Sequence, residues 1–527
     1  MQALIDDTGL ASLSIGGHVA LLGGVEAVEA CAVFGLPASQ SLGPILSRTI
    51  QQLTAGSWIV RQIHQFAEVE YRYTVEGDDV ECLATVTNRG SADMRMIGFT
   101  GLEIDWDGVV PVGIFTGPFW EDSYLLVHGR KLMHPGSDLG MNVGCIYGKT
   151  PAFGLSVCPV GHGLARSFMY TRWEPFGEPT AAPQSLRIYF ETLIQPGASK
   201  SFAFNIRASE NTDWHYLLEP YRQQFVQSFG GLRYAPDDRP SLKMPYADLS
   251  SVGPTNPYGF HLGRRFDTAM GAQEWIDTRM PLMQQATQGC LFWILNGYDA
   301  RIAPLEYSPE VHLLPPEIEA NRPALAAAFA AANLRLGRLG QPQWITEKNT
   351  WATDRFFEIS VDSQSQLDEV WRRFSLAIDA GFTSFYLDSV ALNLDHVCLV
   401  DWFRTKAGPS VLTWTEHVPD VCLPATGAYA WVDGTPGNYQ VHLHGEVFFT
   451  DPACSIVSFY RWLVPGCSIL ASVPDGILTA DVAGLLDWMY AKQVTPLVDD
   501  WLHLAGIPTL GDELASRNAQ HLTDNHW

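Results

Sequence analysis

The sequence predicts a multidomain β plus α/β protein, in which an N-terminal antiparallel β-sandwich precedes a (β/α)8 barrel of the TIM type. Two observations predict this fold class. Residues 1–210 carry short alternating runs separated by Gly, Asp and Asn turns, which is the pattern of a sandwich. Residues 255–527 carry apolar runs that alternate with longer helical patterns, which indicates parallel strands covered by helices. Residues 211–254 are expected to form a helical connector and linker.

Two segments carry the prediction of the sandwich. Residues 69–75 alternate Val, Tyr, Tyr and Val on one face, residues 76–79 turn the chain, and residues 80–87 return as a second strand. Such a pair of alternating runs around a Gly-containing turn is typical of a hairpin. Residues 185–194 place four apolar side chains on one face, namely Leu186, Ile188, Phe190 and Ile194.

The helical connector is predicted over residues 211–227, where Trp214, Leu217, Tyr221 and Phe225 recur at spacings of three and four. In the barrel half, the best helix is predicted over 365–380, with a capping box of Ser365 and Asp368. The apolar runs taken as strands of the barrel are 260–263, 290–295, 357–361, 384–387, 411–414, 428–432 and 468–471.

Composition and charge narrow the class of partner. The chain has 527 residues, 46% of them hydrophobic, and a net charge of −24, which disfavours nucleic acid and anionic membrane surfaces. No apolar run is long enough to span a membrane, and the first residues lack a secretory signal. We therefore expect a soluble protein that is cytoplasmic or released by a non-classical route. The sequence indicates no oligomeric state.

Cysteine spacing and glycine motifs argue against a bound cofactor. The nine cysteines are scattered and form no C-x-x-C pair, so we expect buried thiols rather than a zinc site. Neither a G-x-G-x-x-G motif nor a Walker motif is present. The sequence thus predicts an activity that needs no cofactor.

Three carboxylates directly follow apolar strands of the predicted barrel. Asp388 follows 385–387, Glu416 follows 412–415, and Asp433 follows 429–432. The carboxyl ends of barrel strands point into the active site, and a pair of carboxyl groups is what cleavage of a glycosidic bond requires. Two of the three also have a structural alternative: Asp388 could cap the next helix, and Asp433 precedes Gly434 in a natural turn sequence.

The segment 380–389, Ala-Gly-Phe-Thr-Ser-Phe-Tyr-Leu-Asp-Ser, resembles the fourth barrel strand of retaining glycosidases of the α-amylase and α-galactosidase kind. The resemblance implies that Asp388 is the nucleophile and that Glu416 is the general acid/base. No Asn-His-Asp follows on a later strand, and the fourth strand lacks the lysine of α-galactosidases. The resemblance therefore implies a class of enzyme and leaves the sugar and linkage open. Residues 9–17 and 86–90 resemble the large sandwich that precedes many sugar-processing barrels.

Polar and aromatic side chains near the predicted strand ends are candidates for binding an oligosaccharide or polysaccharide. The polar residues can hydrogen-bond sugar hydroxyls and the aromatic ones can stack on sugar faces, although aromatic residues inside strands usually belong to the core. These candidates are Arg264, Trp293, Asn296, Asp299, Asp362, Tyr386, Asn393, Trp414, His417 and Trp431.

Two other functions are open on the sequence alone. The barrel could serve as a scaffold for carbohydrate binding without catalysis. It could also hold a metal for hydrolysis, because His442 and His444 lie two apart, near Glu446, and His-x-His can bind zinc. A strand with surface or substrate-binding histidines explains that pattern equally, so no metal ligand is assigned.

Overall fold

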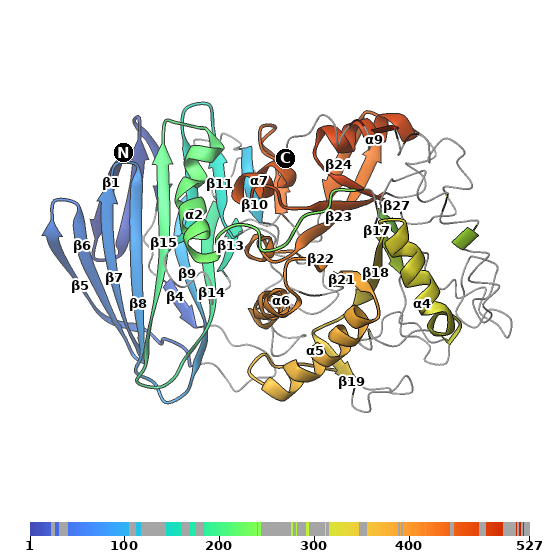
Figure 1. The fold of residues 1–527 in the computed structure, drawn as a ribbon. Coiled ribbons are helices and arrows are strands. Elements are labelled where there is room, and N and C mark those ends of the chain that lie inside the picture. The colour runs from blue at the N-terminus through green and yellow to red at the C-terminus, as the bar shows by residue number, and fades with distance from the viewer. Residues whose placement is uncertain are drawn as a thin grey trace.

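The computed structural model of the protein describes fifteen main stretches of the chain. These are residues 1–22, 27–30, 40–104, 112–116, 144–160, 169–173, 184–239, 241–243, 291–294, 316–346, 356–387, 394–416, 418–442, 447–473 and 481–498, with residues 276–277, 281, 311, 390, 513, 516–517 and 520. Two antiparallel sheets form one end of the molecule, and a parallel sheet with helices around it forms the other (Figure 1). The described residues therefore have a β plus α/β fold.

The first antiparallel sheet contains strands from the beginning of the chain and from the region before residue 195. Its pairing order is β1-β2-β3-β9-β14-β13, and β4 also pairs with β9. The strands are β1 (Gln2–Asp6), β2 (Gly9–Ile15), β3 (His18–Leu22), β4 (Ala27–Ala30), β9 (Met94–Ile104), β13 (Met169–Trp173) and β14 (Gln184–Ile194).

The second antiparallel sheet has the order β25-β10-β11-β12-β15-β8-β7-β6-β5. All but one of its strands come from the first 210 residues. They are β5 (Ile45–Thr54), β6 (Ser57–His64), β7 (Ala67–Glu76), β8 (Asp79–Asn88), β10 (Val112–Thr116), β11 (Ile146–Lys149), β12 (Gly154–Val160), β15 (Ser199–Ser209) and, from the other half of the chain, β25 (Val447–Phe449).

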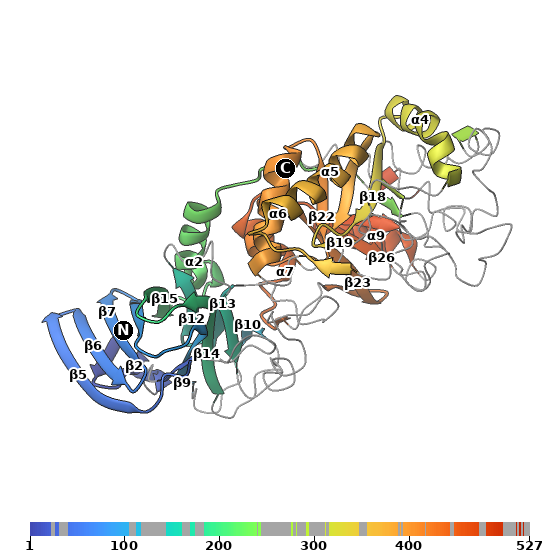
Figure 2. The same ribbon diagram turned by 90° about the horizontal axis from the view of Figure 1, so that it is seen from below.

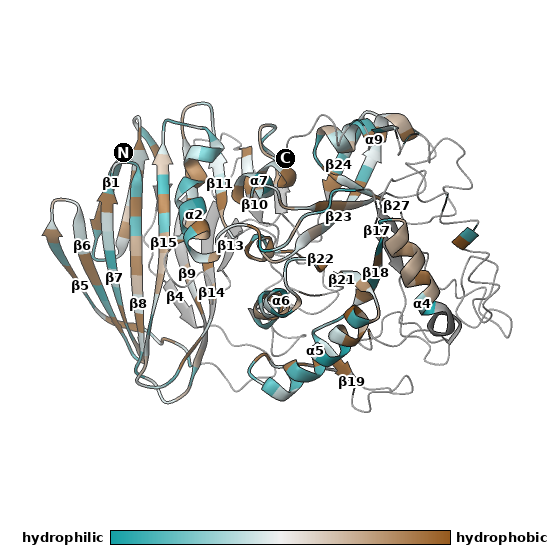
Figure 3. Ribbon diagram, viewed as in Figure 1, coloured by the Kyte–Doolittle hydropathy of each residue, from teal (hydrophilic) through white to brown (hydrophobic). Residues whose placement is uncertain are grey.

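The two antiparallel sheets pack face to face through one hydrophobic core. Phe99 of β9 contacts residues of the opposite sheet, with ring centroids 6.4 Å from Tyr71, 6.0 Å from Phe202 and 5.5 Å from Phe204. The strands form because their side chains alternate: Tyr71 and Tyr73 of β7 are buried, whereas Arg72 and Thr74 are exposed. Figure 3 shows this alternation along β7 and β8. The arrangement is sandwich-like.

The predicted elements of this half are found where the sequence placed them. The hairpin of β7 and β8 runs in continuous antiparallel register from Ala67 opposite Asn88 to Glu76 opposite Asp79. In β14, Ile188, Phe190 and Ile194 are buried on the predicted face. The connector helix is α2 (Trp214–Phe229), which buries the predicted stripe and contacts β11, β12 and β15 (Figure 2).

The parallel sheet closes into a ring. Its neighbours in order are β16 (Ser241–Lys243), β17 (Leu291–Ile294), β18 (Arg335–Gly340), β21 (Phe382–Leu387), β22 (Leu412–Thr415), β23 (Gly427–Thr435), β26 (Ile469–Val473) and β27 (Thr495–Val498). β27 pairs in parallel with β16 and so completes the ring. β24 (Asn438–His442) extends β23 as an antiparallel hairpin.

Helices connect and cover the strands of the ring, as expected for parallel strands, which need crossover connections. They are α4 (Pro316–Ala331), α5 (Gln364–Asp379), α6 (Leu394–Ala407), α7 (Ile456–Leu463) and α9 (Val482–Ala491), with a short 3₁₀ helix η3 (Asp420–Cys422) after β22. The predicted helix 365–380 is α5, and its buried residues include Leu367, Val370 and Phe374.

Three details differ from the sequence predictions. The run 357–361 is not a strand of the ring, because β20 (Phe356–Glu358) pairs antiparallel with β19 (Trp344–Thr346) in a separate two-stranded sheet. The ring begins before residue 255, since β16 lies in the predicted connector 211–254. The N-cap of α5 is Ser363, which makes no side-chain capping bond. The predicted strand 260–263 lies outside the described residues.

Contacts join the two halves of the chain. β25 pairs antiparallel with β10, and the Oδ2 atom of Asp451 accepts a hydrogen bond from Tyr147 at 2.7 Å and forms an ion pair with Lys149 at 2.5 Å. One hydrophobic core contains Tyr147, α2 and the helices of the ring. None of the described helices is both long and apolar enough to cross a bilayer.

Candidate active site at the carboxyl ends of the ring strands

The strand register places Glu416 beside the end of β21. β21 and β22 pair in parallel with Tyr386 opposite Trp414 and Leu387 opposite Thr415. The N–H of Glu416 then donates a hydrogen bond to the carbonyl oxygen of Leu387 at 3.2 Å. This bond belongs to the Leu387–Thr415 pair, which is the last pair of the ladder between the described residues of β21 and β22. Glu416 is therefore the first residue after β22 and lies beside the end of β21.

Aromatic and aliphatic side chains fill the interior of the ring. Tyr386 of β21 and Tyr429 of β23 have ring centroids 4.6 Å apart, and Trp431 meets Tyr429 edge to face at 4.9 Å. The cluster is completed by Tyr234, Leu339, Leu412, Trp414, Leu470 and Leu497, with Leu232 packed against it. Trp414 belongs to this interior, and Glu416, the first residue after β22, is half-buried.

Gly427 makes room for the largest side chain of the interior. A Cβ atom on Gly427 would lie 2.7 Å from Cδ1 and 3.0 Å from Nε1 of Trp414, and 3.1 Å from the carbonyl oxygen of Ser468. The Trp414 side chain is almost fully buried. Trp414 therefore packs directly against the backbone of β23, two residues before Glu416.

A buried arginine fixes the beginning of β22 and the end of the loop that follows it. Arg404 of α6 is 3% exposed and donates to the carbonyl oxygens of Ala425, Gly408 and Val411, each at 2.6 Å, and to Oγ1 of Thr413 at 2.9 Å. Burial lowers the pKa of Arg404 to about 10. These hydrogen bonds hold the beginning of β22, the strand that directly precedes Glu416, in place.

The hydroxyl groups of Thr413, Thr426 and Thr415 form a chain of hydrogen bonds. Oγ1 of Thr413 and Oγ1 of Thr415 each lie 2.9 Å from Oγ1 of Thr426. All three side chains are buried, so the hydrogen bonds satisfy groups that water does not reach. These hydrogen bonds connect β22 to Thr426, the residue directly before β23, and so join the two ends of the loop between these strands.

The middle of that loop is held by a buried carboxylate, Asp420. Its Oδ2 atom accepts hydrogen bonds from the N–H of Gly144 at 3.0 Å and from the hydroxyl of Tyr221 at 2.7 Å. Asp420 is 1% exposed, and burial raises its pKa to about 6, against the lowering effect of the hydrogen bonds from Gly144, Tyr221 and Val421. Asp420 thus connects the Glu416 loop to α2 and to Gly144, two residues before β11.

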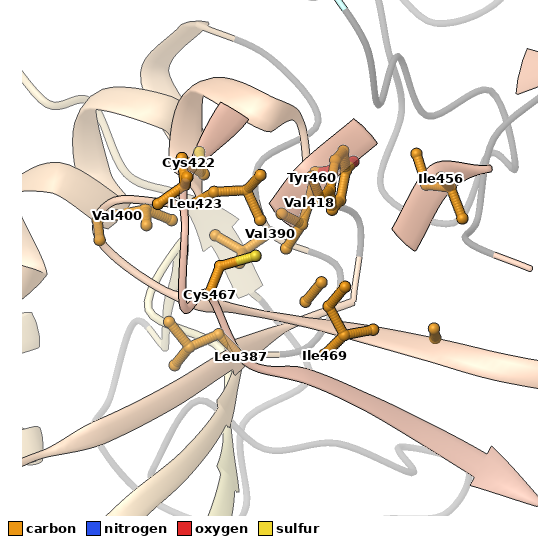
Figure 4. Close-up of a cluster of buried hydrophobic side chains, with 14 of the residues drawn as sticks. Leu387, Val390, Val400, Val418, Cys422, Leu423, Ile456, Tyr460, Cys467 and Ile469 are labelled. Carbon is orange, nitrogen blue, oxygen red and sulfur yellow. The ribbon is translucent and has the colours of Figure 1, made fainter. Parts of the chain in front are cut away.

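An apolar layer supports the same loop from the outside of the ring. The hydroxyl of Tyr460 in α7 donates to the carbonyl oxygen of Val418 at 2.7 Å. Figure 4 shows Val418, Cys422 and Leu423 of the loop beside Leu387 and Ile469 of the strands and Tyr460 of α7. The sequence alone gives no signal for these contacts of Asp420, Arg404, Tyr221 and Tyr460, since partners so distant in sequence leave no local pattern.

Asp433 lies away from Glu416. The pairings of β22 with β23 put Trp414 opposite Gly427 and Thr415 opposite Ala428, so Glu416 is level with Tyr429. Asp433 is four residues farther along β23, which corresponds to about 13 Å at the usual rise of a strand. It is exposed in the hairpin with β24 and accepts a hydrogen bond from the N–H of Gly434 at 2.6 Å. Asp433 pairs with Gln440 inside this hairpin, and the turn itself lies at residues 436–437.

The remaining candidates are placed as follows. Tyr386 and Trp414 are buried in the ring interior, and Trp431 is partly buried there, two residues beyond the level of Glu416. Asp362 is exposed in the loop before α5. Trp293 belongs to β17, whose side chains are not described. The residues outside the described part of the chain are Arg264, Asn296, Asp299, Asp388, Asn393 and His417.

The metal alternative has no support among the residues that the structure describes. They contain no group of three His, Cys, Asp or Glu side chains arranged to hold a metal ion. Of the sequence cluster, only the backbone of His442 is described, at the end of β24, whereas His444 and Glu446 lie outside the described residues. Six of the seven described cysteines are buried, and none of the seven forms a disulfide bond within the described part of the chain.

Solved structures with the same arrangement of strands and helices are known. The α-N-acetylgalactosaminidase NagBb from Bifidobacterium bifidum, in its GalNAc complex, aligns with a TM-score of 0.60 at 13% identity, over 98% of this chain and 91% of that enzyme. Its Gal-NHAc-DNJ complex aligns with a TM-score of 0.61 over the same shares. The chain shares the fold of this enzyme.

An α-galactosidase from Lactobacillus brevis aligns at a TM-score of 0.45 and 11% identity, over 95% of this chain and 71% of that one. The sequence matches no protein-family model, and no curated protein matches it in sequence.

Proposed function

We propose that the protein is a glycoside hydrolase in which Asp388 and Glu416 form the catalytic pair. The observation that carries the proposal is the register of β21 and β22, together with the hydrogen bond from the N–H of Glu416 to the carbonyl oxygen of Leu387. Continuation of that register makes residue 388 the neighbour of residue 416. Adjacent parallel strands lie about 4.8 Å apart, which suits the spacing of about 5–5.5 Å between the carboxyl groups of retaining glycosidases.

The fold supports the proposal. We propose that the closed ring with its helices is a (β/α)8 barrel of the TIM type and that the two antiparallel sheets form a β-sandwich in front of it. Active sites of such barrels lie at the carboxyl ends of the strands, where Glu416 follows β22, and Asp388 is the residue after Leu387, the last of β21, in the sequence. NagBb, which shares the fold, is named as a glycosidase, and fold likeness at this identity supports the class of reaction by analogy only.

The proposed reaction has two steps. In the first, a carboxylate oxygen of Asp388 forms a bond to the anomeric carbon while the glycosidic C–O bond breaks, and Glu416 gives its proton to the leaving oxygen. In the second, Glu416 takes a proton from water, the water oxygen bonds to the anomeric carbon, and the bond to Asp388 breaks. The carboxyl groups return to their starting states, and no cofactor takes part.

Trp431 is the proposed aromatic contact for the sugar. It is partly buried, whereas Tyr386, Trp414 and Tyr429 are almost fully buried in the ring interior. It also stands two residues farther toward the carboxyl end than the level of Glu416, on the side from which an oligosaccharide would approach. The buried aromatic residues would then form the floor beneath the reacting sugar.

The test is hydrolysis of a panel of aryl glycosides that includes α-N-acetylgalactosaminide and α-galactoside. We expect wild-type turnover of at least one substrate, loss of that turnover in Asp388→Ala, and formation of a glycosyl azide when azide is supplied to that variant. Asp433→Asn serves as the matched control and should keep wild-type turnover. Full activity of Asp388→Ala, or activity that chelators abolish, would overturn the assignment in favour of another pair or of a metal.

The same panel of aryl glycosides distinguishes a glycoside hydrolase from a barrel that binds carbohydrate without catalysis. A protein that binds carbohydrate without cleaving it would hydrolyse none of the substrates and would still bind a sugar, measurable by calorimetry. The change in tryptophan fluorescence on sugar binding should be lost in Trp431→Phe if Trp431 makes the contact.

A further inference from the structure

The strand β5 ends the second antiparallel sheet at the far end of the molecule from the ring. It pairs with β6 alone among the described strands. Figures 1 and 2 both show it as the outermost element of the sheet. The backbone N–H and C=O groups along the outer edge of such a strand are directed at whatever lies beside it, and another strand is the structure that satisfies them all.

β5 carries few of the devices that protect a sheet edge. All ten of its residues are exposed or half-buried with no proline among them, and its only charged side chain is Arg48. The register with β6 shifts at Leu46 and at Leu53 and is continuous from Ser47 to Gln52. Leu46, Ile50 and Leu53 are 65%, 42% and 48% exposed. An edge with this central regular stretch and these exposed apolar side chains pairs readily with a further strand.

The charge distribution bears on which protein can supply the further strand that pairs with β5. The chain contains 57 Asp and Glu residues and has a net charge of −24, yet residues 40–67 contain no Asp or Glu, and Arg48 and Arg61 are their only ionised side chains. Two copies that met through most other parts of their surfaces would bring like charges together. The β5–β6 hairpin is a part of the chain that a second copy can approach without that repulsion.

We propose that two copies of the protein associate through β5, each strand pairing with its equivalent in antiparallel orientation about a twofold axis. A twofold axis makes the contact self-complementary. A register centred between Thr49 and Ile50 places Leu46 opposite Leu53 of the second copy and Arg48 opposite Gln51 of the second copy. Leucine then meets leucine at both ends of the pair, and no charge faces a like charge.

The proposal is independent of the catalytic assignment, because β5 belongs to the end of the molecule opposite the ring. Variants of β5 should therefore change the state of association and leave turnover per chain unchanged. This separates failure of the association proposal from failure of the proposed function.

The test is sedimentation velocity of the full chain across a range of concentrations, with hydrogen exchange of residues 45–54. We expect a dimer whose formation slows exchange in β5. Thr49→Glu with Ile50→Glu should raise the dissociation constant at least tenfold, since residue 49 lies opposite residue 50 of the second copy and four added carboxylates then face one another at the axis. Gln223→Glu with Gln227→Glu on α2 changes the net charge equally and should leave the dimer intact. A monomer at all concentrations, or a dimer that the β5 variant does not weaken, would overturn the proposal.

Discussion

Glu416 and Leu387 are joined by a backbone hydrogen bond of 3.2 Å between the N–H of the first and the carbonyl oxygen of the second. The bond lies at the carboxyl ends of two neighbouring parallel strands, where residues of different strands converge. It closes the Leu387–Thr415 pair, the last pair between β21 and β22, and holds the backbone of Glu416 against the end of β21.

Replacement of Glu416 by Gln should remove the proton donor and leave the fold intact. We expect kcat for substrates with poor leaving groups to fall by about 10²–10⁴-fold, which is the usual contribution of general acid catalysis. Substrates with good leaving groups need little protonation and should lose much less in the first step. A series of aryl glycosides with leaving groups of graded pKa measures this, and an equal loss across the series would contradict the role of Glu416.

Asp420→Asn should remove a pH dependence of stability. The folded carboxyl has a pKa of about 6 against an ordinary value of 3.8, so the folded state binds the proton more tightly than the unfolded state. The contribution of Asp420 to the free energy of unfolding is therefore greatest below pH 4 and falls as the pH rises to 6. The difference at pH 7.5 is about 3 kcal/mol at most.

Urea unfolding at pH 4.5 and pH 7.5 checks the Asp420 prediction. Relative to wild type, Asp420→Asn should gain stability at pH 7.5, because the amide oxygen can still accept from Gly144 and Tyr221 without a buried charge. Asp433→Asn, at an exposed position, should show no such pH-dependent difference. A variant that is destabilised equally at both pH values would contradict the prediction.

Gly427→Ala should destabilise the ring and reduce turnover. The added Cβ would lie 2.7 Å from Cδ1 of Trp414, so the indole must move, and overpacking of this kind costs about 1–3 kcal/mol. Since Trp414 is two residues before Glu416, kcat should fall as well. Gly231→Ala, where a Cβ meets nothing within 4 Å, is the control for both thermal unfolding and activity. Wild-type stability of Gly427→Ala would contradict the predicted clash.

Arg404→Met should destabilise the protein by about 3–5 kcal/mol, since it leaves several buried carbonyl oxygens without a donor. Arg72→Met is the contrasting variant. Its side chain is 60% exposed and pairs with Glu70 on the sheet surface, so its removal should cost less than about 1 kcal/mol. Urea midpoints of the two variants measure the difference. Similar midpoints would show that Arg404 does not hold β22 in place.

The sequence predicted the strands whose side chains are strongly apolar, and the structure confirms β21, β22, β23 and β26 within a few residues. It missed β18 because Arg335 and Arg338 interrupt the apolar pattern there. It also missed β16, which is only three residues long, and β27, which carries Pro496. Local composition identifies strands buried on both faces and fails for short or polar ones, which the rest of the sheet stabilises.

The candidate site could be predicted only in part for a similar reason. The order of residues after an apolar strand pointed to Glu416, whose catalytic role stays a prediction. The partners of Asp420 lie 276 and 199 residues away in the sequence. No periodicity or motif connects Gly144, Tyr221 and Asp420, so their contact emerged only from the folded chain.

The pairing of β10 with β25 sets an order for the folding of the nascent chain. β10 ends at Thr116, and β25 begins at Val447, so at a synthesis rate of about 5–20 residues per second roughly 20–60 s pass before the second strand follows the first out of the ribosome. During that interval the sheet lacks the strand that covers β10. A fragment that stops before residue 447 would keep that edge open permanently, and the antiparallel half therefore depends for its completion on the half made last.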